Sequence, residues 1–199
     1  QRDGRWYGYF GGITLEQDRG SIYLRDTSPE LYEVDMADGR IRKVARRAEG
    51  DTERDWLINP DGTVAAALDF LPKDGSWKIR NGAGKELAAG RNPLGGIGLV
   101  SVGRTPGTIL YVRTDENDGT ESWFEIPQQG GTPQQVLSET GVRHAYIDDR
   151  SRQLIGYRSS DDKFDSVFFD AQRQKVMRGT RKAFPGLNVE LVDWNDAFD

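Results

Sequence analysis

A strand–turn–strand pattern recurs along this chain at a nearly constant spacing, and that spacing is the strongest constraint on its fold. Gly62 lies between a short strand-like run and a longer apolar one. Gly107 and Arg152 hold the matching positions in two later segments, and each lies 45 positions after the one before. An all-strand unit that repeats with a period in the forties is typical of a β-propeller, in which each repeat forms one blade.

The stretch 97–137 shows the repeating unit most clearly. Its predicted strands are rich in β-branched and aromatic residues, except for a short polar fourth: Ile97–Val102, Thr108–Arg113, Trp123–Pro127 and Pro133–Leu137. Turn residues separate these runs, and Asp118-Gly119 supplies the positive φ angles that a two-residue hairpin turn requires. The stretch therefore predicts one antiparallel meander of the size of a propeller blade.

The same pattern divides the whole chain, 1–199, into four repeats and part of a fifth. The predicted blades are 3–47, 55–91, 97–138 and 142–180, with 188–199 as the first strand of a further blade. The first repeat lacks its own first strand and carries a loop insertion within Gly11–Arg25. The prediction is an all-β fold of about four blades, either an arc of a larger propeller or a small closed ring. A β-sandwich or an irregular barrel is the alternative.

Composition favours many short strands and limits the classes of function. The chain holds 24 Gly, and Asp-Gly pairs begin at Asp3, Asp38, Asp61, Asp74 and Asp118. A net charge of −5 gives no support to a nucleic-acid surface. No run approaches the roughly 18 apolar residues that span a bilayer, and the absence of cysteine excludes disulfides and thiolate chemistry. We expect a soluble protein of the cytoplasm or the periplasm, with the compartment left open.

His144 is the only histidine, so a histidine-dependent triad or metal site would have to use it. It lies in a predicted strand and is interpreted as a structural residue. The nucleophile elbow G-x-S-x-G is missing, because Ser101 is out of step with its neighbouring glycines and Ser159-Ser160 has none. The sequence therefore predicts no catalytic residue, and the chain alone is not expected to be an enzyme.

Several clusters resemble ligand sites but depart from the spacing that those sites require. In Asp115–Gly119 the glycine comes one place too early for a calcium loop, and Ile126 replaces its closing glutamate. Gly82–Lys85 lacks the spacer of a phosphate loop, and Gly96–Gly98 has Ser101 at the third glycine of a dinucleotide fingerprint. All are interpreted as turns, as are Asp148-Asp149 and Asp161-Asp162. No metal ligand and no cofactor-binding residue is predicted.

Four aromatic residues near the N-terminus, Trp6, Tyr7, Tyr9 and Phe10, are too dense for one buried face. Side chains alternate between the two faces of a strand, so some of the four should pack between sheets and others should lie exposed. Any exposed aromatic side chain here is the best candidate for contact with another domain.

Longer segments carry a family resemblance. These are LYEVDMADGRIRKV (31–44), INPDGT, RSRQLIGYRSSDDKFDSVFFDAQ and AFPGLNVELVDWNDAFD. They are similar to the β-propeller domain of the prolyl oligopeptidase family of serine peptidases, which includes dipeptidyl aminopeptidases, acylaminoacyl peptidases and lasso-peptide isopeptidases. The resemblance covers most of the chain from Leu31 to Asp199, and Leu154–Asp199 is its most specific part.

The resemblance implies a multi-domain enzyme. In that family a propeller of seven or eight blades covers an α/β-hydrolase domain with a Ser-Asp-His triad, limits access to short or unstructured peptides and contacts the substrate. This chain would supply propeller blades, with the hydrolase domain and the peptide as its partners and possible self-association through exposed strand edges. The paired-glutamate segment of dipeptidyl peptidases is missing, so the peptidase subtype stays open. The rival hypothesis is a free-standing propeller that acts as a protein- or ligand-binding scaffold. A glycan-acting propeller enzyme is a third, and it would need paired carboxylates in one pocket.

Overall fold

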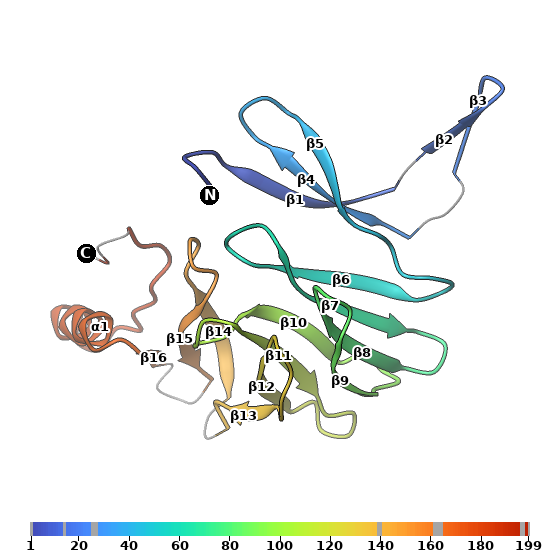
Figure 1. Ribbon diagram of the computed structural model, residues 1–199. Coiled ribbons are helices and arrows are strands. Elements are labelled where there is room, and N and C mark those ends of the chain that lie inside the picture. The colour runs from blue at the N-terminus through green and yellow to red at the C-terminus, as the bar shows by residue number, and fades with distance from the viewer. Residues whose placement is uncertain are drawn as a thin grey trace.

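Small antiparallel sheets follow one another along the chain in the computed structural model (Figure 1), which describes residues 2–13, 15–24, 28–138, 141–160, 165–195 and 198. Strands are the main structure of these residues, so the all-β prediction is confirmed. Except for the pairing of β1 with β4, neighbouring strands in each sheet are consecutive in sequence, because short turns reverse the chain between them.

The first sheet has three strands in the order β1 (Tyr7–Gly12), β4 (Glu30–Asp35) and β5 (Ile41–Ala45). The predicted insertion forms a separate hairpin of β2 (Leu15–Asp18) and β3 (Ser21–Leu24), which projects away from the other sheets in Figure 1. The first sheet therefore lacks one strand relative to a four-stranded meander, as the repeat pattern predicts.

The second and third sheets are complete four-stranded meanders. The second consists of β6 (Glu53–Ile58), β7 (Val64–Leu71), β8 (Ser76–Asn81) and β9 (Glu86–Arg91). The third consists of β10 (Ile97–Val102), β11 (Thr108–Thr114), β12 (Glu121–Pro127) and β13 (Gln134–Val136). The strands predicted for 97–137 all form, with ends that differ by at most two residues.

The fourth sheet corrects the prediction. It contains β14 (Val142–Ile147), β15 (Leu154–Ser159) and β16 (Ser166–Phe168), but helix α1 (Ala171–Ala183) stands where the repeat predicts a last strand. The prediction for 188–199 is also wrong, because 188–195 and 198 form no strand. Apart from Val176, strong helix formers fill 171–178, and the Asp170 carboxylate caps the helix by accepting a hydrogen bond from the Arg173 N–H at 2.9 Å. Within the described residues, no helix is both long and apolar enough to cross a membrane.

Backbone geometry confirms that the repeated turns match. Gly62, Gly107 and Arg152 have φ angles of 85°, 80° and 57°, and each lies in the turn between the first two strands of its sheet. A non-glycine residue rarely adopts a positive φ, so Arg152 keeps the turn geometry of its two glycine counterparts. The period of 45 residues therefore reflects a repeated structure.

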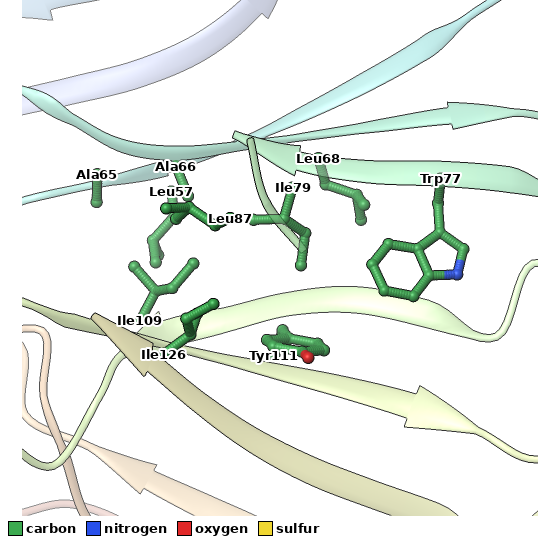
Figure 2. Close-up of a cluster of buried hydrophobic side chains, with 10 residues drawn as sticks. All are labelled: Leu57, Ala65, Ala66, Leu68, Trp77, Ile79, Leu87, Ile109, Tyr111 and Ile126. Atoms are coloured by element: carbon green, nitrogen blue, oxygen red, sulfur yellow. The ribbon is translucent and has the colours of Figure 1, made fainter. Parts of the chain in front are cut away.

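The main hydrophobic core lies between the second and third sheets (Figure 2). Leu57, Leu68 and Ile79 from the second sheet face Ile109 and Ile126 from the third. Ile79, Ile109 and Ile126 are fully buried. Alternation along each strand sends these residues to one face, so the two sheets stack face to face.

The third sheet is also buried on its other face. Leu110, Trp123 and Val136 pack with Leu154 of the fourth sheet. Beyond the fourth sheet, a further cluster joins Tyr146, Ile155 and Phe168 to Met177 of α1 and to Phe198, with Val189, Leu191 and Trp194 packed against it. The C-terminal segment thus covers the fourth sheet and its helix.

Ile109→Ala tests the contact between the second and third sheets. Because Ile109 is fully buried, the substitution should leave a cavity and lower the free energy of unfolding by about 2–5 kcal/mol. Ile41→Ala is the matched control, since Ile41 is 68% exposed and its truncation should change stability by no more than about 0.5 kcal/mol. Urea denaturation measures both, and equal losses would contradict the stacking.

Candidate interaction surface

The first sheet differs from the other three in having a largely exposed apolar face. The strand register places Phe10, Tyr32, Val34 and Ile41 on the same side, which we call the outer face. Phe10 is 52% exposed and Ile41 is 68% exposed. Large apolar side chains that cluster on a surface mark interaction sites more often than single exposed ones do.

The aromatic residues near the N-terminus divide as predicted. Trp6 is 58% exposed and Phe10 lies on the outer face, whereas Tyr7 and Tyr9 are half-buried on the opposite face. The Phe10 ring lies over Gly8, where an added Cβ would come within 2.5 Å of the ring carbon Cε2. Glycine at this position therefore lets the ring lie flat on the strand.

The insertion adds further exposed apolar residues. In the β2–β3 hairpin, Leu15 pairs with Leu24 and Gln17 pairs with Ile22, so the three aliphatic side chains share one face. All three are exposed, at 62%, 48% and 67% for Leu15, Leu24 and Ile22. A hairpin of two strands with no core of its own is marginally stable in water.

The opposite face of the first sheet holds a buried carboxylate, Glu33, which is 6% exposed. The Tyr9 hydroxyl donates a hydrogen bond to Glu33 Oε2 at 2.6 Å, and Arg2 Nη2 contacts the same oxygen at 2.5 Å. Arg42 Nη2 donates to Oε1 at 3.0 Å. Both oxygens are therefore satisfied, and the buried charge is paired.

This network shifts the pKa values of its members. Burial, the hydrogen bond to Glu33 and the charge of that carboxylate together raise the pKa of Tyr9 to about 12. Burial alone would raise the pKa of Glu33, but hydrogen bonds from Tyr9 and Arg42 and the nearby arginine charges outweigh it and lower that pKa. Glu33 is thus held ionised and Tyr9 is held protonated.

The third sheet repeats the same arrangement. Glu125 in β12 is 8% exposed and accepts hydrogen bonds from Arg104 Nε at 3.2 Å and from the Thr105 N–H at 3.1 Å. Arg104 lies in the turn before β11, as Arg2 lies in the turn before β1. In both sheets, an arginine of this turn reaches a buried glutamate on the strand that pairs with the one following the turn. The repetition indicates a structural role for both pairs.

In the described part of the chain, His144 makes no hydrogen bond with Ser101 or Ser159. His144 is exposed on β14, and its ring lies 4.9 Å from the Tyr146 ring. Ser101 is buried in β10 and donates its hydroxyl hydrogen to the Val102 carbonyl at 2.8 Å. The Ser159 hydroxyl accepts a hydrogen bond from the Asp165 N–H. Across the described residues, no three His, Asp or Glu side chains cluster in a way that could hold a metal ion.

The acidic and glycine clusters mostly form turns, as predicted. Asp115 accepts a hydrogen bond from the Asn117 N–H at 2.8 Å, and Asp148 accepts one from the Ser151 N–H at 2.7 Å. The side chain of Asn81 organises the turn at Gly82–Lys85 in the same way. Of Gly96–Gly98, only Gly96 precedes β10, whereas Gly98 lies within that strand. Asp161-Asp162 lies outside the described residues.

The network around Glu33 is not predicted by the sequence patterns. The signal is present in β4, where Leu31, Glu33 and Asp35 alternate on the face that should be buried. An acidic residue at a core position predicts a nearby cation, but the sequence does not show which arginine supplies it. Arg2, which lies 31 positions away, is brought in by the pairing of β1 with β4.

Comparisons with known proteins identify no family for this chain. No protein-family model matches the sequence, and no curated protein matches it significantly.

The pKa of Tyr9 gives a direct test of the Glu33 network. The chain has seven tyrosines, so the ultraviolet absorbance of phenolate is titrated in the original protein and in Tyr9→Phe. The titration curve of the original protein minus that of Tyr9→Phe should show one tyrosine that ionises near pH 12. Because the folded state raises this pKa above 10.0, the stability it contributes is present below pH 10.0 and is lost as the pH rises toward 12. A difference curve centred at the ordinary value would contradict the network.

Glu33→Gln tests the acid side of the same network. The pKa of Glu33 is lowered in the folded state, so its contribution to stability is present above the ordinary value of 4.5 and is lost as the pH falls. The variant should lose about 1–3 kcal/mol near neutral pH and show a weaker decline in stability toward acid. Glu121→Gln, at an exposed strand residue, is the control. Parallel pH profiles of Glu33→Gln and the original protein, measured by urea denaturation, would refute the assignment.

Proposed function

We propose that this chain forms consecutive blades of a β-propeller that resembles those of the prolyl oligopeptidase family, and that it gates peptide access to an α/β-hydrolase domain. The observation that carries the proposal is the face-to-face stacking of the second, third and fourth antiparallel sheets in chain order, with their matching turns 45 residues apart. Stacking of this kind is how propeller blades bury their hydrophobic faces.

An arc of blades is favoured over a closed ring. Tyr32 and Val34 on the outer face correspond in the repeat to Phe124 and Ile126, and Ile126 is fully buried against the second sheet. The outer face therefore has the chemistry of an inter-blade surface, and another blade would cover it. The C-terminal segment does not provide that cover, because it packs against α1 and the fourth sheet.

Helix α1 replaces the last strand of the four-stranded blade pattern. In the third sheet that last strand is β13, which has only three residues. The two strands at the other edge, β14 and β15, keep the antiparallel pairing found in the preceding sheets. Replacement of the fourth strand by a helix therefore leaves intact β14 and β15, the strands that would lie nearest a propeller axis.

In the proposed mechanism, these blades contribute shape and contacts, and the chemistry belongs to the hydrolase domain. The blades would restrict substrates to peptides that are short or unfolded, since a folded protein cannot pass a narrow opening. The exposed Trp6 and Phe10 side chains offer large apolar area for contact with a neighbouring domain. The buried Glu33 and Glu125 pairs would hold the blade turns in fixed positions.

A free-standing scaffold is the second candidate, and the projecting β2–β3 hairpin favours it. Its exposed aliphatic face could bind another protein without any hydrolase domain. The full reading frame that encodes this chain distinguishes the two candidates. A G-x-S-x-G segment elsewhere in that frame, within alternating strands and helices, supports the peptidase. A frame without such a domain supports the scaffold.

The purified chain should not hydrolyse peptide esters or peptide anilides above the rate of buffer alone. His144→Ala should leave this background unchanged, because His144 is exposed on β14 with no serine–histidine hydrogen bond among the described residues. A chromogenic peptide assay measures both proteins. Turnover that depends on His144 would show that the chain is itself catalytic and would overturn the gating role.

A further inference from the structure

The turn that leads into β1 has the geometry of a β-hairpin. The Arg2 N–H donates to the Arg5 carbonyl at 3.0 Å, and the Arg5 N–H donates to the Arg2 carbonyl at 2.8 Å. The two residues between them, Asp3 and Gly4, have φ angles of 48° and 76°. Positive φ at both central positions is the mark of a type I′ turn, whose twist matches two paired antiparallel strands. One of those strands is β1.

The second edge of β1 is open. Tyr7–Gly12 pairs with Asp35–Glu30 of β4 without a break in register, and no other backbone pairs with β1 in the described part of the chain. In the second and third sheets, the corresponding edge is covered by β6 and by β10. The sequence YGYFGG carries no proline or lysine, and the strand has no bulge, so the usual protections of a free edge are missing.

Side-chain contacts hold the turn in one orientation. The Arg2 guanidinium lies 4.0 Å from the centre of the Tyr7 ring, donates to the Asp61 carbonyl at 3.2 Å and pairs with Glu33. The turn is thus fixed both to its own sheet and to the β6–β7 turn of the second sheet. A strand that enters this turn is directed along the open edge of β1.

We propose that β1 accepts one further strand, formed by the polypeptide that runs into the Arg2–Arg5 turn from its N-terminal side. This strand is antiparallel to β1 and completes the first sheet as a four-stranded meander. Its residue opposite Gly8 lies on the outer face and is apolar, as Leu57 is opposite Ala66 in the second sheet. The inference rests on backbone pairing and holds for either proposed function.

An N-terminal extension tests the proposal. A copy of Glu53–Ile58, the residues of β6 that fill this place in the second sheet, is joined directly to Gln1 of the full chain. Native-state hydrogen exchange then reports on the amides of β1. Exchange of those on the open edge should slow by about ten-fold or more relative to the unextended chain, because they gain backbone partners.

Two variants of the extended protein serve as controls. Proline at alternate positions of the added segment removes its hydrogen-bond donors and should abolish the protection. Gly4→Ala strains the turn at a φ of 76° and should also reduce it, whereas Gly50→Ala, at a φ of 62° in a distant turn, should not. Neither glycine has an atom within 4 Å of an added Cβ, so both substitutions act on backbone conformation alone.

The possible outcomes are distinct. Protection of β1 that disappears with the proline extension and with Gly4→Ala supports the proposal. Unchanged exchange on extension, or equal protection by the proline extension, overturns it. Protection of β1 in the unextended chain that grows with protein concentration also overturns it, because a second copy would then occupy the edge. Peptidase assays play no part, so failure here is separate from failure of the gating role.

Discussion

The contact between the second and third sheets is the interaction on which the other sheets depend. Burial of apolar side chains is the main favourable contribution to folding, and Ile79, Ile109 and Ile126 are completely buried at this contact. Because the third sheet is also covered on its other face by the fourth, it is the most enclosed sheet of the chain. The fourth sheet packs on the third, and the turn of the first sheet is bonded to a turn of the second.

The first sheet follows a different principle. Its inward face is organised by Glu33 and its arginine and tyrosine partners, and its outer face leaves Phe10 and Ile41 exposed. Hydrogen-bonded ion pairs fix geometry but contribute less net stability than an apolar core of similar size. The first sheet is therefore well oriented and incompletely buried, which suits an element that takes part in further contacts.

Local signals made much of this fold predictable. The strands and turns of 97–137 were accessible because alternation and Asp-Gly turns act within a few residues. Helix α1 was not, since the repeat period predicted a strand there, and the few apolar residues at helical spacing, Val176, Met177 and Thr180, lie in an otherwise polar run. The Glu33 network depends on strand pairing across 31 positions, which no local pattern specifies.

The most direct test of the account is a nuclear Overhauser measurement between Trp77 of the second sheet and Tyr111 of the third. The stacked arrangement places the centres of these rings 6.3 Å apart, although the residues belong to different meanders. Cross-peaks between the indole and phenol ring protons are the predicted result. Their absence in the folded protein would show that the two sheets do not pack face to face, and the proposed series of blades would then fail.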